Sequence, residues 1–209
     1  MRKTALLIIS LFLLLSYNSY AQEDNQNEQT NDSINSIKHI GLGIKIGIPN
    51  LVGGFAEVIL PFFNNHFATF VDYSSFPVGD DIKISPKYLE YGVNYYFGEK
   101  GHGLFISVSK SNFDGDITYK ELSFGEGIKG SGSTELNFNT TNFKLGLKSG
   151  GRFYFRFELG YGMGDIPNQL DFIATASGIT KNFTEEISVI PGLVTSGVLI
   201  GNIGFGYSF

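Results

Sequence analysis

Charged side chains that recur among glycines and apolar residues are the best candidates for an internal site in this chain. They are Lys45, Glu57, Glu90, Lys144, Arg156 and Glu158, with Lys148 and Arg152 further toward one end of the same segments. Both signs occur, and a buried charge is costly unless it is paired, so we expect a salt-bridged network that fills the interior. The expected centre of this network is Glu57, Lys144, Arg156 and Glu158. The functional alternative is a gated ion path through the same residues.

Catalytic and metal-binding patterns are weak. His39, His66 and His102 fall near predicted strand ends or turns, and no two have the spacing of metal ligands. The segment Asp114-Gly115-Asp116 matches the start of a calcium loop but lacks the later carboxylates, so we interpret it as a solvated turn. The acidic residues of the expected outer loops are Asp80, Asp81, Asp165, Asp171, Glu185 and Glu186. No histidine is expected beside them to act as a base, and the sequence predicts no enzyme activity, cofactor or metal site.

Alternating hydrophobicity predicts the strands that would position the charged residues. Between Arg152 and Gly164, the odd positions are aromatic or apolar and the even positions are mostly charged or glycine. Segments 40–48, 88–97 and 202–209 repeat this period of two, which is typical of strands with two different faces. The composition of 20 Phe, 11 Tyr and 27 Gly, with no Cys or Trp, also favours an all-β fold.

The orientation of these faces decides the class of protein. Glycine weakens a strand and gains nothing from facing water, so its recurrence opposite the aromatic residues predicts a crowded interior such as that of a narrow barrel. The apolar face must then point outward, which is tolerable only in lipid. The predicted lipid-facing wall comprises Phe153, Phe155, Phe157, Leu159, Ile203 and Phe205.

The spacing of the strands predicts one barrel with long connections on one side. The expected strands cover 38–48, 52–62, 66–75, 87–98, 102–113, 134–148, 152–164 and 196–209. Connections after the second, fourth and sixth strands are short and those after the third, fifth and seventh are longer, as in membrane barrels. Patterned segments within the long connections predict external hairpin arms at about 114–133 and 165–195, the second bounded by Pro167 and Pro191.

The N-terminal segment predicts export. Arg2 and Lys3 precede an apolar run, and small residues follow at Ser19 and Ala21, so residues 1–21 are expected to be a signal peptide. Residues 22–37 are polar and predict a disordered leader, which leaves 38–209 for the barrel. The net charge of −5 is scattered without a basic stripe, and a nucleic-acid partner is not expected.

The terminal sequence Gly-Asn-Ile-Gly-Phe-Gly-Tyr-Ser-Phe, the Ser-Tyr-Ala-Gln processing site and the strand at 152–164 together resemble a known group. It comprises the small eight-stranded outer-membrane barrels of the OmpA and OmpX kind, and especially the outer-membrane β-barrel domain family of Bacteroidetes. The resemblance covers about 38–209. It implies a porin-like barrel in the outer membrane of a Gram-negative bacterium, with Tyr207 and Phe209 in the C-terminal signal for the barrel assembly machinery.

The expected function is structural or interactive and resides in the external arms. We expect a non-enzymatic, monomeric barrel in the lipid bilayer, with any protein partner outside the cell contacting those arms. One alternative is the small ion channel through the charged lumen. Another is a soluble exported ligand carrier like the lipocalins, which would require the face of Phe153, Phe155 and Phe157 to point inward.

Overall fold

The computed structural model describes residues 37–77, 79, 82–98, 100–123, 129–176, 179–186 and 192–209. The expected signal peptide, nearly all of the expected leader, and Asp80, Asp81 and Pro191 lie outside these ranges. The strands are β1 (Ile40–Ile48), β2 (Leu51–Ile59), β3 (Phe67–Ser74), β4 (Ile82–Tyr96), β5 (Gly103–Ser123), β6 (Lys129–Lys148), β7 (Phe153–Met163), β8 (Gln169–Ala176), β9 (Ile179–Glu186), β10 (Leu193–Val194) and β11 (Gly197–Ser208). No described segment is a helix long and apolar enough to cross a membrane.

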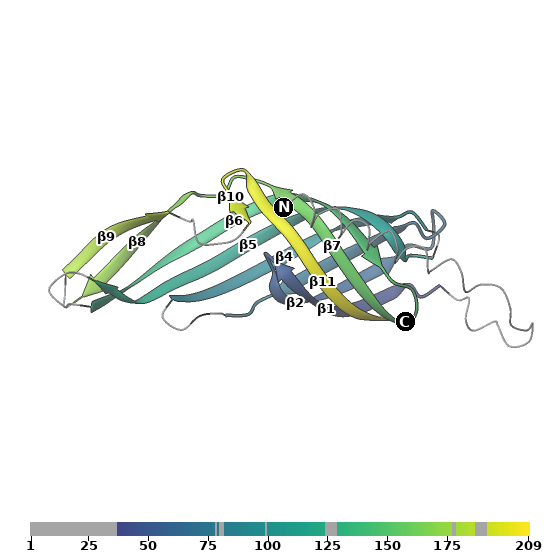
Figure 1. Cartoon of the computed structure of the whole chain (residues 1–209), viewed down its shortest axis with the longest axis horizontal. Helices are drawn as coiled ribbons and strands as arrows, with labels where there is room; N and C mark the ends of the chain where they lie inside the picture. Colours follow the sequence, from purple (N-terminus) through teal and green to yellow (C-terminus); the bar gives the residue numbers. More distant parts are fainter. Residues whose placement is uncertain are drawn as a thin grey trace, which may run out of the picture. The chain divides into compact units, whose positions relative to one another are not determined.

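Eight of these strands close into an antiparallel barrel (Figure 1). Strands β1 to β7 pair in sequence order, β7 pairs with β11, and β11 returns to β1. Closure pairs the wall strands on both sides, so the wall has no free edge there. The prediction of an all-β, up-and-down barrel of eight strands is therefore confirmed. We call the end where β1 begins and β11 finishes the proximal end, and the opposite end the distal end.

The two faces of the wall differ as the alternation predicts. Phe153 is 81% exposed and Phe205 is 57% exposed on the outside, whereas Lys45 is 1% exposed inside. Phe155, Leu159 and Ile203 also face outward, and Phe157 is half-buried. A soluble ligand carrier would need the reverse orientation, with the phenylalanine face inside. Apolar residues around the outside of a closed barrel are instead suited to lipid.

Glycines on the inner face make room for large rings in a narrow interior. A Cβ atom on Gly146 would collide with the ring of Phe105, and one on Gly206 would collide with the ring of Tyr154. Glycine is required at these positions because neighbouring strands bring whole aromatic side chains against the main chain.

The wall is much taller on one side than on the other. β5 has 21 residues and β6 has 20, whereas a tilted strand needs only about 9–11 residues to cross the apolar part of a membrane. β1, β2 and β3 have 9, 9 and 8 residues. The hairpin of β8 and β9 adds to the tall side, because β8 pairs with β6 at Ser131–Ser133.

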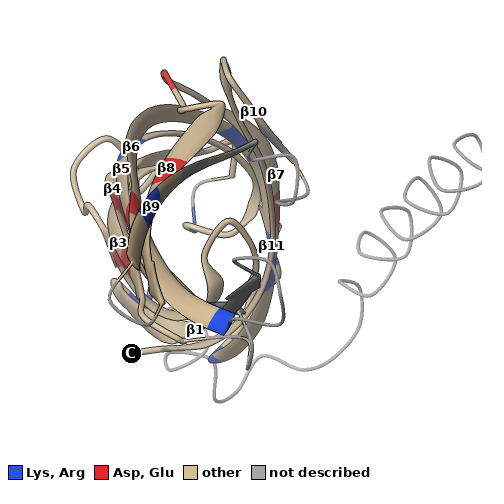
Figure 2. Ribbon diagram, turned by 90° about the vertical axis from the view of Figure 1, so that its left-hand side faces the viewer, with Lys and Arg blue, Asp and Glu red and all other residues tan. Residues whose placement is uncertain are grey.

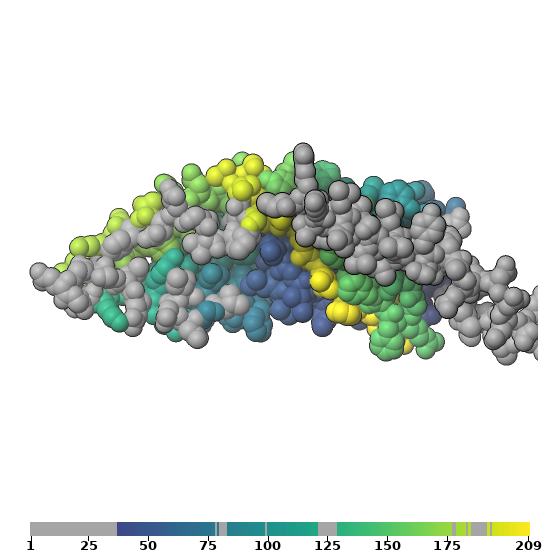
Figure 3. Space-filling view, viewed as in Figure 1, coloured from purple at the N-terminus to yellow at the C-terminus, as the bar shows by residue number. Residues whose placement is uncertain are grey.

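The distal parts of β4 (82–87), β5 (110–123) and β6 (129–141), together with β8 and β9, form what we call the projecting sheet. Figure 1 shows these strands running beyond the barrel, and Figure 3 shows teal and green surface extending past the blue surface of the shorter strands. The sheet thus continues the barrel wall at the distal end without closing into a second ring.

The polarity of the two faces inverts where the projecting sheet begins. On β5, the outward residues change from Ile106 and Val108 to Lys110 and Asn112, while the inward residues change from Ser109 to Phe113 and Ile117. On β6, the outward residues Leu147, Leu145 and Phe143 are followed by Asn139, Asn137 and Glu135. Apolar residues face outward where lipid surrounds the wall and inward where water does. The hydrocarbon boundary therefore crosses β5 near residue 109 and β6 near residue 141.

Several expected boundaries were wrong, those on the projecting sheet for this reason. The expected external arm at about 114–133 is present, because β5 and β6 continue past the barrel as a pair, but Asp114-Gly115-Asp116 lies within β5, paired with residues 85–87, rather than in a turn. The expectation failed because outward polar residues resemble a turn when water, not lipid, surrounds a strand. β4 likewise begins at Ile82 instead of residue 87. The second strand ends at Ile59 instead of residue 62, because Pro61 and left-handed residues follow it.

This boundary predicts that a lysine on the outward face of β6 lowers stability on one side of the boundary and changes it little on the other. Leu145→Lys places a charge in the apolar band and should lower the free energy of unfolding in lipid vesicles by about 2–4 kcal/mol. Asn139→Lys, six positions away on the same outward face, should change it little. Urea titration of the vesicle-inserted protein measures both values. Equal costs at the two positions would show that the boundary is misplaced.

Candidate functional site

Glu57 is the proximal centre of a buried charge network inside the barrel. Its carboxylate accepts hydrogen bonds from Lys148 Nζ at 2.5 Å and Arg156 Nη1 at 2.6 Å. Asn94 Nδ2 at 2.8 Å and the Tyr96 hydroxyl at 2.8 and 3.0 Å also donate to it. Two cations and two neutral donors therefore surround this carboxylate, whose side chain is fully buried.

Glu158 links most of the remaining charges. Its carboxylate accepts hydrogen bonds from Arg156 Nε at 2.5 Å and Lys45 Nζ at 3.1 Å. Lys144 Nζ and Asn202 Nδ2 each donate to it at 3.3 Å. Arg156 thus bridges Glu57 and Glu158 with two separate nitrogen atoms, which suits the planar geometry of a guanidinium group.

Two further carboxylates complete the network toward its distal side. Asp72 Oδ2 lies 2.5 Å from Lys45 Nζ, and Glu90 Oε1 lies 2.7 Å from Lys144 Nζ. Tyr88, Ser109 and Asn142 also donate to Glu90. The four carboxylates are matched by four cations, namely Lys45, Lys144, Lys148 and Arg156. Figure 2, viewed along the barrel, shows acidic and basic positions on strands around the ring.

The structure brings together all six charged residues that the sequence singled out, since each is at most 4% exposed and in the network. Lys148, expected nearer the proximal end, also joins it, whereas Arg152 is exposed in a turn. Asp72 was missed. Its position between the outward residues Val71 and Tyr73 indicates that Asp72 faces inward. The polar inner face was hard to recognise in the sequence because Phe70, an apolar residue, also faces inward.

Aromatic rings line the space between the charges. Arg156 Cζ lies 4.4 Å from the centre of the Phe105 ring, and Lys144 Nζ lies 4.6 Å from that of Phe70. Lys148 Nζ lies 4.4 Å from the centre of the Tyr154 ring. A cation over an aromatic face is stabilised by the ring quadrupole, most strongly when both groups are out of water.

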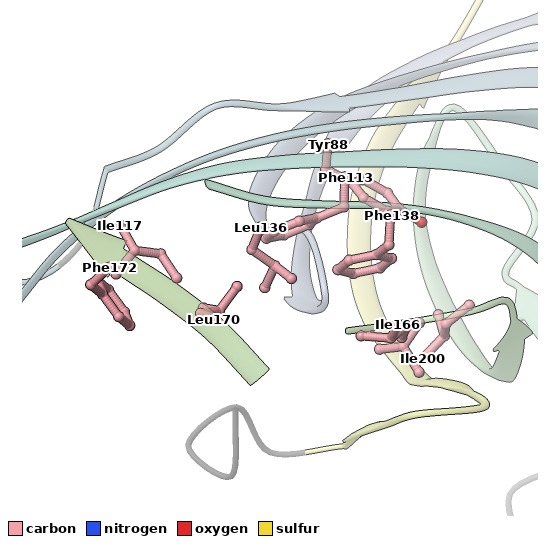
Figure 4. Packing of buried hydrophobic residues seen from close by; sticks show 10 residues of the cluster. Tyr88, Phe113, Ile117, Leu136, Phe138, Ile166, Leu170, Phe172 and Ile200 are labelled. Carbon is pink, nitrogen blue, oxygen red and sulfur yellow. The ribbon is translucent and has the colours of Figure 1, made fainter. Parts of the chain in front are cut away.

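Apolar clusters cover the network toward both ends of the barrel. The proximal cluster is formed by Ile59, Ala68, Tyr96 and Phe105. The distal cluster contains Tyr88, Phe113, Ile117, Leu136, Phe138, Ile166, Leu170, Phe172, Val198 and Ile200. Figure 4 shows the rings of Phe113 and Phe138 stacked, with Ile166 and Ile200 on the other side of the mouth. The charges therefore lie between two apolar layers and away from bulk water.

The histidines lie at the proximal end, away from the outer carboxylates, and no hydrogen bond or ion pair joins one of them to the network among the described residues. His39 Nδ1 is 3.0 Å from the Ile59 carbonyl oxygen, and His66 Nδ1 is 2.7 Å from that of Tyr96, both at the proximal end. Burial and the nearby Lys100 lower the pKa of His102, in the turn before β5. Asp165 and Asp171 lie at the distal end. Within the described ranges, no three His, Asp or Glu side chains are grouped to hold a metal ion.

Fold and site together define a class of protein: a membrane-spanning β-barrel whose narrow interior is filled by paired charges and capped by apolar layers. No family model matches the sequence, and no curated protein matches it. The predicted relation to the OmpA and OmpX kind and to the Bacteroidetes family therefore stays a prediction.

A solved structure shows the same fold. The crystal structure of Acinetobacter baumannii CarO matches with a TM-score of 0.52 and 11% sequence identity, over 84% of this chain and 100% of that chain. The crystal structure of A. baumannii CarO2 has the same identity and coverage with a TM-score of 0.47. At this level of identity, the likeness to CarO concerns the fold alone.

Removal of one member of the network should be strongly destabilising. Arg156→Met leaves two carboxylates without the cation that joins them, and we expect a loss of about 3–5 kcal/mol in the free energy of unfolding. Lys110→Met removes an exposed charge from the outside of β5 and serves as the matched control, with little change expected. Urea unfolding in detergent micelles measures both, and a small effect for Arg156→Met would contradict a network that stabilises the fold.

Proposed function

We propose that the protein is an outer-membrane barrel of a Gram-negative bacterium that binds an extended segment of another protein outside the cell through its projecting sheet. The role is non-enzymatic and needs no cofactor. The observation that supports it best is the difference between the two edges of the projecting sheet, since one edge is blocked against further strand pairing and the other is open.

The β4 edge is the blocked one. β3 pairs with β4 only as far as Tyr88, so residues 82–87 have β5 as their single neighbour among the described strands. This stretch contains Pro86, which has no N–H to donate, and the exposed Lys83 and Lys87. Proline on an edge strand is a known protection against unwanted pairing, and because β9 also carries an exposed lysine, Lys181, the proline is what distinguishes the two edges.

The β9 edge is the open one. β9 pairs with β8 on one side, and no other described strand pairs with it. Residues 179–186 contain no proline, so no position of β9 lacks a main-chain N–H. An added strand supplies main-chain hydrogen bonds along such an edge, and side chains on alternate positions give specificity.

A second copy in the same membrane is poorly suited to supply that strand. Antiparallel pairing of β9 with β9 of another copy would point the two barrels in opposite directions, because β9 continues the long axis of the barrel (Figure 1). We therefore favour a monomeric barrel and a different protein as partner. Assembly would use the machinery that reads C-terminal strands ending in residues such as Tyr207 and Phe209.

The interior does not favour the channel alternative. Each of the eight network charges is at most 4% exposed, each has an opposite charge within 3.3 Å, and apolar clusters lie on both sides of them. Conduction would require these pairs to separate and the apolar layers to open. An interior filled by side chains is what a barrel of eight strands is expected to have.

Strand addition predicts selection of extended peptides by the projecting sheet. Peptides enriched from a random phage-displayed library on the reconstituted protein should lose binding when residues 169–186 are replaced by a short glycine-serine linker. They should also lose binding when alternate amides of the peptide are N-methylated, because this removes main-chain donors. Binding affinity is measured on vesicles, with unchanged gel mobility of the folded variant as the control. Peptides that bind equally well without β8 and β9 would refute the proposal.

The sealed interior predicts that the wild-type protein carries no steady ionic current in planar bilayers. The barrier is the packed network and its apolar layers, so openings should be absent at moderate voltage. Stepwise currents in the wild type that change in Arg156→Ala protein would instead support the ion channel. Insertion is verified by protease protection of the same preparation.

A further inference from the structure

The turn between β2 and β3, residues 60–66 at the proximal end, exposes two large rings. Phe62 is 58% exposed and Phe63 is 68% exposed. The two other proximal turns differ in composition, since described residues of 97–102 and 149–152 beyond Phe97 are Gly, Lys, His, Ser and Arg. Of the three turns that join barrel strands at this end, the one after β2 therefore exposes two rings, and the described residues of the other two turns expose one, that of Phe97.

The backbone of this turn is unfavourable in itself. Phe63, Asn64 and Asn65 have φ values of 63°, 54° and 60°, which places three consecutive residues in the left-handed region. Asparagine tolerates this region, but a bulky residue such as phenylalanine rarely adopts it. Non-glycine residues in such conformations persist where the surroundings compensate, often at functional sites. Water around an exposed Phe63 ring gives no such compensation.

The rings of the turn belong to a continuous aromatic patch. The Phe63 ring lies 5.5 Å from both the Phe62 and Phe67 rings, and Phe67 lies 5.2 Å from Tyr95. Phe97 lies 5.5 Å from Tyr95 on the other side. Tyr95 is part of the outer wall, next to the exposed Val93. The aromatic turn thus extends the lipid-facing surface beyond the proximal ends of β2 and β3.

The turn joins two of the three shortest strands of the barrel, which are β1, β2 and β3. β2 and β3 have 9 and 8 residues, at or below the roughly 9–11 that a tilted strand needs to cross the apolar part of a membrane. A membrane protein with too short an apolar span must thin the bilayer or extend its span with flanking residues. In membrane barrels, girdles of aromatic residues flank the apolar band at both interfaces.

We propose that the aromatic turn inserts Phe62 and Phe63 into the proximal leaflet of the bilayer, at the boundary between headgroups and acyl chains. The ligand of this surface is lipid. The turn completes the apolar band on the short side of the barrel, and lipid contact offsets the unfavourable left-handed backbone of Phe63. The inference requires that the barrel spans a membrane but is independent of strand binding at β9.

The absence of tryptophan from the sequence makes a direct test possible. Phe62→Trp and Phe63→Trp each introduce the single tryptophan of the chain, in vesicles containing phosphatidylcholine brominated near the headgroup or deep in the acyl chain. We expect strong fluorescence quenching at both positions, greater with the shallow bromines. Lys100→Trp, in a polar turn at the same end, is the matched control and should be quenched little. Phe155→Trp in the outer wall should be quenched and reports that the barrel is inserted.

Quenching of the Phe62 and Phe63 variants no greater than that of Lys100→Trp, with Phe155→Trp quenched, would overturn the proposal. A change in the fluorescence of Phe62→Trp or Phe63→Trp that appears only when a periplasmic protein is added would assign the turn to a protein partner. That result would also overturn the proposal. Phe63→Asn separates lipid contact from a plain connecting role, because asparagine tolerates the left-handed backbone but lacks the ring. We expect a lower urea midpoint for Phe63→Asn than for the wild type in vesicles, whereas an equal or higher midpoint contradicts lipid anchoring.

Discussion

Charge pairing inside a ring of only eight strands is the interaction on which the rest of the structure depends. Glu57 and Glu158 hold all eight network residues together, directly or through one shared cation, and Arg156 joins the two carboxylates. A charge that lost its partner in this interior would have neither water nor another ion to replace it. The inner face must therefore be matched in sign, and its glycines must leave room for the long side chains.

The outer face follows a different rule, which depends on height along the barrel. Where lipid surrounds the wall, apolar residues point outward and the polar groups are confined to the interior. Beyond Val108 on β5 the surroundings are water, and the same strand turns apolar residues such as Phe113 and Ile117 inward while polar residues face outward. The projecting sheet thus has an apolar core of its own, continuous with the layer that covers the charge network. The same continuous strands serve as membrane wall and as external surface. The main-chain pairing is unchanged along them, and only the face that carries the apolar side chains differs.

Much of this could be predicted from the alternation of residues along single strands. The period of two in 152–164 established both the strand and its lipid-facing side, and the charges at Lys144, Arg156 and Glu158 were assigned to the interior by the same parity. Prediction failed where the pattern inverts. Asp114 was assigned to a turn because a polar outward residue carries the same signal in a solvated strand as in a loop. Asp72 was missed because inward Phe70 made the two faces of β3 look alike.

The sequence by itself determined the strand periodicity, the opposed faces and thus the barrel class, because these properties are local and repeat along the chain. The tertiary structure alone decided which charges pair, since Lys148 and Glu57 are 91 residues apart and meet only when the ring closes. It also decided the unequal height of the wall and the exposure of the β9 edge. Both depend on which strands pair and in what register, and register is a property of two paired strands rather than of one strand alone. The left-handed backbone of Phe63 is likewise a property of the folded turn, imposed where β2 must reverse into β3.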